Sequence, residues 1–189
     1  MDKLREHNII LKGCRITLRP MTENDWDVIH RWDTDPEVLY FSEEDDVTGY
    51  TIEESQDIYR GTSQNAFNFI IECVGKRIGY CWLQKMNLQH ILADFPSIDC
   101  RRIDLGIGEK ELWGQGLGTE VIQLLTKFGF EQEKADAIFG CGVADYNPRS
   151  RRAFEKNGYT LYREYTQPEG MKTKISYDLV LRRDEYVRI

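Results

Sequence analysis

One segment in the second half of the chain strongly restricts how the chain can fold. An apolar, strand-like run ends at Ile107, glycines follow at positions 114, 116 and 118, and a helical pattern begins directly after them. The apolar positions of that pattern are Val121, Ile122, Leu124, Leu125 and Phe128. A helix N-terminus presents unpaired backbone N–H groups and a partial positive charge, and glycines let an anion approach them closely. The segment therefore predicts a strand, a phosphate-binding loop and a helix in direct succession.

The glycine spacing excludes two common phosphate-binding motifs. The loop reads Gly-x-Gly-x-Gly, whereas a Walker loop needs GxxxxGK[ST] and a dinucleotide-binding loop needs GxGxxG. The alternative interpretation is a glycine-rich turn that only lets the helix pack closely on the strand. Short glycine motifs often occur without a ligand, so this segment alone leaves both interpretations open.

The remaining pattern predicts a mixed α/β domain around a central sheet. Strands are expected where polar and apolar residues alternate or short apolar runs lie between turn residues, and helices where apolar residues follow a capping residue at helical spacing. A Gly75-Lys76 hairpin turn and a loop over 87–96 are also expected. The expected strands are 15–19, 67–74, 77–86, 98–107, 137–144, 159–165 and 175–181, and the expected helices are 22–32, 51–59, about 119–133 and 147–156.

Composition supports a globular domain and excludes several classes of protein. The 189 residues are 41% hydrophobic and 12% aromatic, which is enough for a core and excludes disordered and collagen-like chains. The formal net charge of −7 argues against a general nucleic-acid binder, because that affinity comes mostly from basic residues that neutralise phosphates. An acidic surface instead attracts cationic ligands.

The cysteines, the histidines and the hydropathy lead to expectations about the compartment, metal sites and membrane spans. The five cysteines form no CxxC pair and are expected to be free thiols in a reducing, cytoplasmic compartment. The three histidines form no HExxH motif, so no metal site is expected. There is no apolar run of about 18 residues, so no membrane span is expected. We therefore expect one domain over 1–189, with 1–13 as an N-terminal extension, acting as a monomer or homodimer without nucleic-acid or membrane partners.

Four segments, in order along the chain, resemble the GNAT (GCN5-related) N-acetyltransferase family. Segment 113–120, Trp-Gly-Gln-Gly-Leu-Gly-Thr-Glu, resembles its pyrophosphate loop, and 147–159 resembles its late helix, N-x(6)-[YF]-x-K-x-G-[FY]. Segments 14–20 and 78–80 resemble its first strand and its central hairpin. The resemblance covers about residues 15–181. It implies the GNAT fold, a mixed, mostly antiparallel sheet of six to seven strands flanked by about four helices.

The resemblance also implies a co-substrate, acetyl-CoA, and direct transfer of its acetyl group to a primary amine. Backbone N–H groups of 115–119 would hold the pyrophosphate, the strand backbone at 105–107 would pair with pantetheine, and Asn147 would face the pantetheine arm or the thiol. The residues implied in cofactor binding are Leu105, Gly106, Ile107, Trp113, Gly114, Gln115, Gly116, Leu117, Gly118, Thr119, Asn147 and Phe154.

Two of these positions depart from the family's usual residues. Trp113 stands where the family more often has Gln or Arg, although the ribosomal-protein branch and many antibiotic-modifying members commonly have Trp there. Phe154 stands where many members have a Tyr that is proposed to protonate the departing thiolate. A phenylalanine has no proton to give, so the resemblance leaves the general acid unassigned.

Asp104 is the candidate catalytic residue. It matches an acidic residue with which aminoglycoside 6′-N-acetyltransferases hold or deprotonate the substrate amine. An amine with a pKa of about 10 must lose a proton before it attacks a thioester, so a nearby carboxylate is useful. The alternative is a solvated carboxylate or an ion-pair partner of Arg101 or Arg102. Further candidates for acceptor binding are Asp94, Asp99, Tyr80 and Trp82, with core packing as the alternative for Trp82.

The resemblance favours a cationic small molecule of the aminoglycoside type as the acceptor. Segments 39–41, 50–55, 78–80 and 104–108 are similar to that group. A protein N-terminus of the ribosomal-protein type fits the Arg19-Pro20 start and the glycine loop equally well, and a polyamine is a third acceptor for the same chemistry. A non-catalytic, acetyl-CoA-binding regulatory domain is the alternative from a different class, and Phe154 is the feature that supports it.

Overall fold

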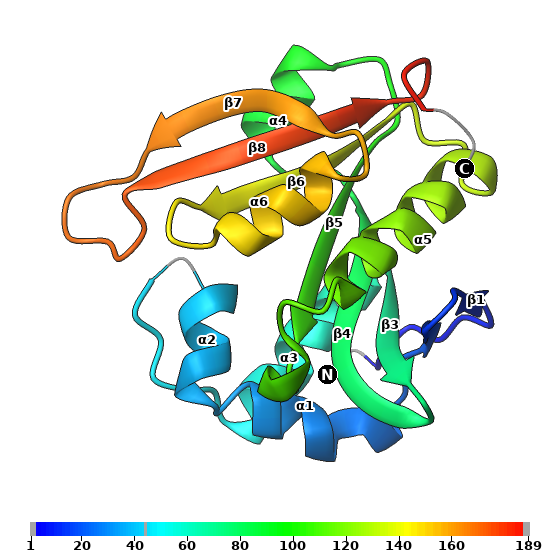
Figure 1. Cartoon of the computed structure of the whole chain (residues 1–189), viewed down its shortest axis with the longest axis vertical. Helices are drawn as coiled ribbons and strands as arrows, with labels where there is room; N and C mark the ends of the chain where they lie inside the picture. The colour runs from blue at the N-terminus through cyan, green and yellow to red at the C-terminus, as the bar shows by residue number, and fades with distance from the viewer. Residues whose placement is uncertain (1–2, 44, 187–189) are drawn as a thin grey trace.

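The computed structural model describes residues 3–43 and 45–186, and its strands form one eight-stranded sheet (Figure 1). The strand order is β1-β2-β3-β4-β5-β6-β8-β7. Neighbouring strands are antiparallel except β5 and β6, which run parallel. The strands are β1 (Leu11–Lys12), β2 (Ile16–Pro20), β3 (Ala66–Cys73), β4 (Lys76–Lys85), β5 (Cys100–Ile107), β6 (Ala137–Ala144), β7 (Thr160–Thr166) and β8 (Ile175–Arg182).

Six α-helices lie in the described part of the chain and cover both faces of the sheet. They are α1 (Trp26–Trp32), α2 (Pro36–Ser42), α3 (Ile52–Ser63), α4 (Gln89–Asp94), α5 (Leu117–Glu131) and α6 (Pro148–Glu155). Short 3-10 turns occupy Glu23–Asp25 and Lys110–Leu112. No helix within 3–43 or 45–186 is long and apolar enough to cross a membrane.

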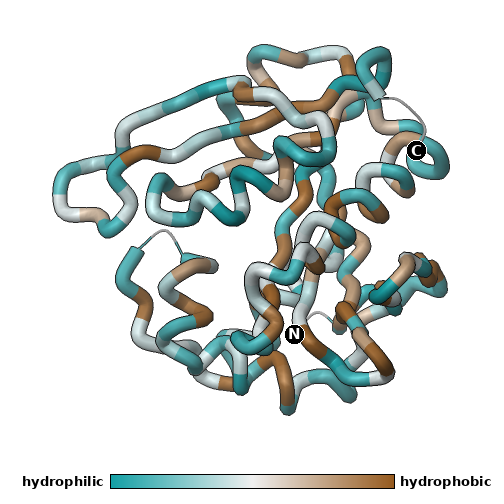
Figure 2. The backbone as a smooth tube through the Cα atoms, viewed as in Figure 1, coloured by the Kyte–Doolittle hydropathy of each residue, from teal (hydrophilic) through white to brown (hydrophobic). Residues whose placement is uncertain are grey.

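Alternation along the strands divides the core between two faces. Ile138 and Leu179 pack with α5 and α6 on one face, whereas Phe139 and Val180, one residue further along, pack with α4 on the other. Helices α1, α2 and α3 lie on the same face as α4, where their apolar residues pack against Tyr80. Figure 2 shows the hydrophobic segments concentrated along the central strands, while α6 is mostly hydrophilic. The mixed α/β sheet with helices on both faces confirms the expected fold class.

The sheet has one strand more than the upper expected number. The extra strand is β1, in which Leu11 pairs with Leu18 of β2 and is buried. Part of the expected N-terminal extension therefore belongs to the sheet. A two-residue strand leaves almost no alternating pattern to detect, because its pairing depends on a neighbour rather than on its own sequence.

Two helices were not expected, and the prediction of a loop over 87–96 is wrong. Helix α4 lies there and buries Ile91 completely, but its first turn has no side-chain cap to signal it. Helix α2 lies in a polar stretch, although Asp35 accepts hydrogen bonds from the N–H groups of Glu37 and Val38 and Pro36 occupies the first helical position. These helices are six and seven residues long, too short for apolar periodicity to distinguish them from loop.

Local sequence signals at helix ends are confirmed. Thr51 and Glu54 form a reciprocal capping box at α3, and Asn147 caps α6 ahead of Pro148. The hairpin between β3 and β4 differs by one residue from expectation, because Val74 and Gly75 are the turn residues and Lys76 already belongs to β4. Both turn residues have positive φ, which matches the twist of a two-residue hairpin.

Strands β5 and β6 separate halfway along their length. Their paired positions are limited to Cys100–Arg102 on β5 and Ala137–Phe139 on β6. Beyond these positions β6 turns away toward α6 with a bulge between Gly140 and Val143, while β5 continues beside β4 (Figure 1). The second half of β5 therefore has backbone groups that no strand pairs on one side, which leaves an edge inside the sheet.

Candidate functional site

The glycine loop opens α5 with an N-terminus that no side chain caps. Gly116 is the N-cap residue with φ of 80°, and Gly114 has φ of 75°, a left-handed conformation that residues with a Cβ rarely adopt. Helical geometry leaves the first N–H groups of α5 without intrahelical partners. The loop thus directs several backbone donors and the positive end of a helix dipole toward one place, as expected for an anion site.

Arg15 and Glu120 fix the loop against the first long strand. Glu120 lies in the first turn of α5 and accepts hydrogen bonds from the Arg15 backbone N–H at 2.8 Å and from Arg15 Nε at 3.0 Å. Arg15 Nη1 donates to the Gln115 carbonyl at 2.8 Å. Burial opposes ionisation of Glu120, but these hydrogen bonds outweigh it and keep its pKa below the ordinary value. The ion pair therefore holds the loop in position from behind.

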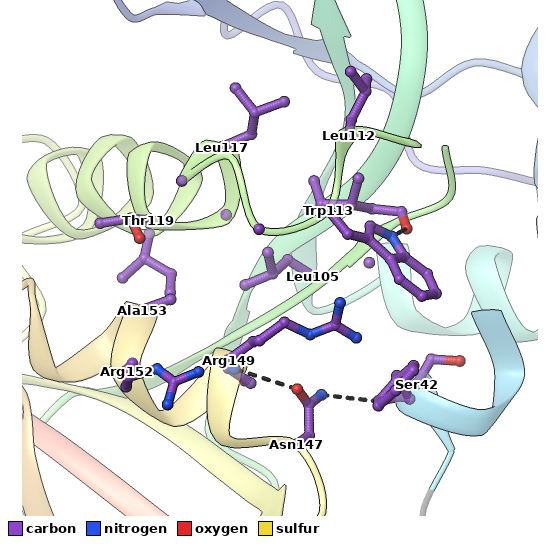
Figure 3. Close-up of a pocket in the computed structure, with 18 of the residues that line it drawn as sticks. Ser42, Leu105, Leu112, Trp113, Leu117, Thr119, Asn147, Arg149, Arg152 and Ala153 are labelled. Atoms are coloured by element: carbon purple, nitrogen blue, oxygen red, sulfur yellow. Dashed lines mark hydrogen bonds between the residues drawn. The ribbon is translucent and has the colours of Figure 1, made fainter. Parts of the chain in front are cut away.

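A cavity of about 270 Å³ lies in front of this loop. It extends from α2 and the second half of β5, past the glycine loop, to α6 (Figure 3). Ten of the residues implied in cofactor binding line it: Leu105, Gly106, Ile107, Trp113, Gly114, Gly116, Leu117, Gly118, Thr119 and Asn147. The structure thus brings together in one cavity the loop, the unpaired edge of β5 and the start of α6.

Two of the implied cofactor residues lie outside this cavity lining. Gln115 turns its side chain back to the Glu111 carbonyl at 2.9 Å, so its backbone is its remaining route to a ligand. Phe154 is 3% exposed and packs in the core against Gly140 and Tyr159. A side chain at position 154 therefore supports the sheet beneath α6.

Side chains at the end of α2 and the start of α6 also form the cavity, and among them Arg149 was not singled out by the sequence analysis. Arg149 projects toward Trp113, and its guanidinium lies 4.7 Å from the Trp113 ring and 4.5 Å from the Phe41 ring (Figure 3). Asn147 uses its oxygen to cap α6 and its amide to donate to the Phe41 carbonyl at 3.3 Å. The cavity is therefore closed on one side by α2.

The sequence contained a pattern that could have indicated the basic cavity residues at α6. Arg149, Arg152 and Lys156 line the cavity and recur at three- and four-residue spacing, which places them on one helix face. Cations at that spacing give one helix face a positive potential, which attracts phosphate charge. The α2 residues carried no such signal, because contact between Phe41 and Trp113 joins segments that are far apart in sequence.

Asp104 lies on β5 but does not line the cavity, and it is held in an ion pair. Arg102 donates to both Asp104 oxygens, at 2.8 Å and 2.5 Å, and Trp82 Nε1 donates to Oδ2 at 2.9 Å. We call Trp82, Arg102 and Asp104 the Asp104 cluster. The ion-pair alternative considered for Asp104 is thus present in the structure, and its role as the catalytic residue stays a prediction.

Tyr80 packs directly beside this cluster. Its ring stacks on Trp82 with 5.8 Å between centroids, and the residue is 7% exposed. A Cβ on Gly106 would lie 2.8 Å from Tyr80 Oη, so the glycine is what allows this hydroxyl to lie against β5. Tyr80 and Trp82 are therefore close to the cavity wall, although neither lines the cavity.

The other two acidic candidates are not brought to the cavity. Asp94 accepts hydrogen bonds from the Tyr162 hydroxyl and, at 3.0 Å, from Arg163 of β7. Asp99 pairs with Arg101 at 2.7 Å before β5 begins to separate from β6. Among the described residues that line the cavity, neither aspartate occurs.

Comparison with known proteins identifies the class. Residues 15–160 match the acetyltransferase (GNAT) domain family, which is most of the chain. The chain therefore belongs to the GNAT family and is an acyltransferase that uses acetyl-CoA. A curated relative, the uncharacterized N-acetyltransferase p20 of Bacillus licheniformis, is 25% identical over 182 residues, covering 90% of this chain and 94% of its own.

Solved structures share the fold at low sequence identity. A structure of AAC(6')-Ib with ribostamycin and coenzyme A has a TM-score of 0.74 at 20% identity, covering 91% of this chain and 96% of its own. RimL, a ribosomal L7/L12 alpha-N-protein acetyltransferase bound to coenzyme A, has a TM-score of 0.75 at 15% identity, covering 94% and 100%. The fold is thus shared by acetyltransferases with different acceptors.

Proposed function

We propose that this protein transfers the acetyl group of acetyl-CoA to a primary amine of a cationic small molecule, with an aminoglycoside-like acceptor favoured. The uncapped N-terminus of α5, opening on a cavity beside the unpaired edge of β5, is the observation that carries the proposal. A backbone site of this kind takes a pyrophosphate without needing a side-chain charge.

The residues present fit acetyl-CoA. The N–H groups of 115–119 would hold the pyrophosphate, and the cations of α6 would add attraction for phosphate charge. The free edge of β5 at 105–107 would pair with the amides of pantetheine as an added strand does. When bound, the co-substrate supplies a thioester, and the N–H of Gly106 or Ile107 is available to stabilise the developing oxyanion.

The Asp104 cluster supports an amine acceptor beside β5. A carboxylate there attracts a cationic amine, and Trp82 provides an aromatic surface beside it. Because Arg102 already shares Asp104, an acceptor must add its ammonium to an existing pair. Asp104 would accordingly bind and orient the amine.

A protein N-terminus and a polyamine remain the alternative acceptors within the same chemistry. The likeness to AAC(6')-Ib supports the first choice, and the likeness to RimL supports a peptide N-terminus with similar strength. Function resides in the acceptor pocket rather than in the fold, so acceptor identity needs a direct assay.

The test is a thiol-release assay with acetyl-CoA and a panel of amines: kanamycin, tobramycin, spermidine, and peptides that begin with Ala or Ser. We expect turnover with one class, with kcat/KM highest for the aminoglycosides. Turnover only with peptides or spermidine would replace the favoured acceptor by an alternative. Saturable acetyl-CoA binding by calorimetry without turnover of any amine would contradict transfer and support a regulatory domain.

A further inference from the structure

The two strands that flank β8 each carry one extra residue, and both irregularities lie beside Asp178. On β6, Cys141 and Gly142 together face the single position of Asp178, because the register with β8 shifts by one residue there. On β7, Tyr162 is the residue that the register with β8 skips, next to the position that pairs with Asp178. A β-bulge bends its strand and increases the local twist. Two bulges at one level of the sheet therefore bend β6, β7 and β8 together.

The bend comes directly after the last pair between β5 and β6. That pair joins Arg102 to Phe139, and the bulge residue Cys141 follows two positions after Phe139. From there β6 turns toward α6 while β5 continues beside β4 (Figure 1). The second half of β5 and the start of α6 then line the cofactor cavity. The bulge on β6 therefore lies where the slot between β5 and β6 begins to open.

Asp178 supplies the hydrogen-bond acceptor that the β6 bulge needs. A bulge leaves a backbone N–H without its partner in the ladder, and the N–H of Gly142 donates instead to Asp178 Oδ1 at 2.9 Å. Gly142 has φ of 64°, a left-handed conformation that suits glycine. Asp178 is completely buried, and burying a carboxylate is costly unless donors satisfy it. The carboxylate and the bulge thus stabilise each other.

Helix α4 supplies a side-chain partner at each of the two bulges. His90 Nε2 lies 2.9 Å from Asp178 Oδ2, and a carboxylate only accepts, so this nitrogen carries the hydrogen. Asp94, one helical turn further along, accepts a hydrogen bond from the Tyr162 hydroxyl of the β7 bulge. Ile91 lies between them in the sequence and is completely buried, which anchors the helix on the sheet. We call His90, Asp94 and Asp178 the bulge bracket.

We propose that Asp178 is a positioning residue for the pantetheine arm of the co-substrate. Through the N–H of Gly142 it holds the bulge that keeps β6 apart from β5, and His90 holds Asp178 in turn from α4. The inference rests on the proposed placement of the arm along 105–107. Without the Asp178 acceptor, the buried N–H regains a partner only when β6 returns to regular pairing. A regular β6 would continue beside β5 and occupy the positions that the arm needs.

A positioning role and a purely stabilising role of Asp178 affect two ligands differently. Adenosine diphosphate carries a pyrophosphate but no pantetheine, so its affinity reports on the glycine loop alone. Coenzyme A carries both groups, so its affinity also reports on the slot between β5 and β6. Damage to the whole fold weakens both ligands, whereas a closed slot weakens only coenzyme A. The ratio of the two dissociation constants therefore separates positioning from general stability.

The experiment measures both dissociation constants by calorimetry for wild type, Asp178→Leu and Asp178→Asn. Leucine removes both acceptor oxygens, so coenzyme A affinity should fall about tenfold or more while the affinity for adenosine diphosphate stays within about twofold of wild type. Asparagine keeps an oxygen for the Gly142 N–H and an amide for the imidazole, so it should restore most of the lost affinity. Equal losses for both ligands in Asp178→Leu, unchanged coenzyme A affinity, or no rescue by asparagine would overturn the proposal.

His90→Phe is the second variant, and it decides the question if Asp178→Leu does not fold. The His90 side chain is 33% exposed, so the substitution leaves the core intact. It removes one of the two donors to Asp178 and should weaken coenzyme A about threefold without weakening adenosine diphosphate; an unchanged ratio would contradict the bracket. The matched control is Ser63→Ala in α3, which removes another completely buried acceptor of a backbone N–H, that of Arg5 at 2.9 Å, and should leave both affinities unchanged.

Failure of this inference and failure of the proposed function give different results. If wild type acetylates no amine but Asp178→Leu loses coenzyme A affinity selectively, transfer is contradicted and the role of Asp178 is supported. If wild type acetylates an amine and the ratio of the two dissociation constants is the same in every variant, transfer is supported and the role of Asp178 is overturned.

Discussion

The cofactor cavity and the Asp104 cluster both adjoin β5 and differ in the atoms that form them. The cavity presents mainly backbone groups, from the glycine loop and the free edge of the strand. The cluster presents side chains, in which Arg102, Asp104 and Trp82 depend on one another. Under the proposed function, backbone groups would bind the co-substrate, whereas the side chains of the cluster would bind the acceptor and could be exchanged to suit a different one. The contrast would account for one fold that serves several acceptors.

The sharpest test of the backbone side is Gly116→Val. Valine is strongly disfavoured at a φ of 80°, so the loop must change shape and its N–H groups lose their common direction. We expect coenzyme A affinity, measured by calorimetry, to fall by about 100-fold, or roughly 2.7 kcal/mol. Gly61→Ala in α3, where a Cβ meets no atom within 4 Å, is the control and should bind normally. Tight binding by a folded Gly116→Val protein would remove the loop from the site.

Beside the cofactor cavity, we expect the side chain of Glu120 to stabilise the fold rather than to contact a ligand. Glu120→Gln weakens the hydrogen bonds from Arg15 and Ile16 and should lower the free energy of unfolding by about 1–3 kcal/mol near neutral pH. Because the folded pKa of Glu120 is lowered, this stabilisation exists above the ordinary value of 4.5 and is lost as pH falls through the folded pKa.

Urea unfolding of wild type and Glu120→Gln at several pH values checks this expectation. The difference between the two proteins should shrink as the solution becomes acidic. Glu155→Gln, which removes only an exposed pair with Arg151, is the control and should change stability by less than about 0.5 kcal/mol. A constant difference down to pH about 3 would contradict the role of the ionised carboxylate.

On the side-chain face, Asp104→Asn should reduce kcat/KM for a cationic amine at least tenfold, about 1.4 kcal/mol, while coenzyme A affinity stays constant. The amide keeps the shape of the side chain but removes the charge that attracts the ammonium. Asp27→Asn breaks a comparable fork with Arg77 at the surface and should leave kcat/KM unchanged. Equal rates for wild type and Asp104→Asn would remove Asp104 from the site.

The smallest effect is expected where α2 meets the β7–β8 connection. Lys172 donates to the Tyr40 carbonyl at 3.0 Å and lies over the rings of Tyr40 and Tyr146. Lys172→Met should lower the free energy of unfolding by about 0.5–1 kcal/mol and speed amide exchange in α2. Hydrogen exchange measured by mass spectrometry tests this, with α3 peptides as the internal reference. Unaltered exchange in α2 would show that Lys172 does not hold this helix.

The sequence predicted the local structure of the glycine loop and of the start of α6 more completely than the contacts of the Asp104 cluster and of α2. Glycines at 114 and 116 and the cap at Asn147 have local causes, so each could be predicted from its own neighbours. The hydrogen bonds of Asp104 and the contact of Arg149 with Phe41 join elements far apart in the chain. Such pairs depend on strand register and helix placement, which no local pattern specifies. The short helices α2 and α4 were not predicted for a related reason, because tertiary packing rather than an apolar periodicity stabilises them.

The separation of β5 from β6 has a consequence for how the molecule unfolds. In the described structure, where the β1–β5 half meets the β6–β8 half, β5 and β6 pair over three positions, and backbone N–H groups of Asp136 and Ala137 add hydrogen bonds to the Asp99 carbonyl at the same end. A short seam of this kind lets two halves open as separate cooperative units at a lower free energy than global unfolding. A ligand in the cavity would contact β5, α5 and α6 together. Its binding free energy would therefore stabilise the two halves against separating from each other. Occupancy by coenzyme A should therefore turn two partly independent folding units into one, and slow amide exchange in β6 and β8 as much as beside the ligand.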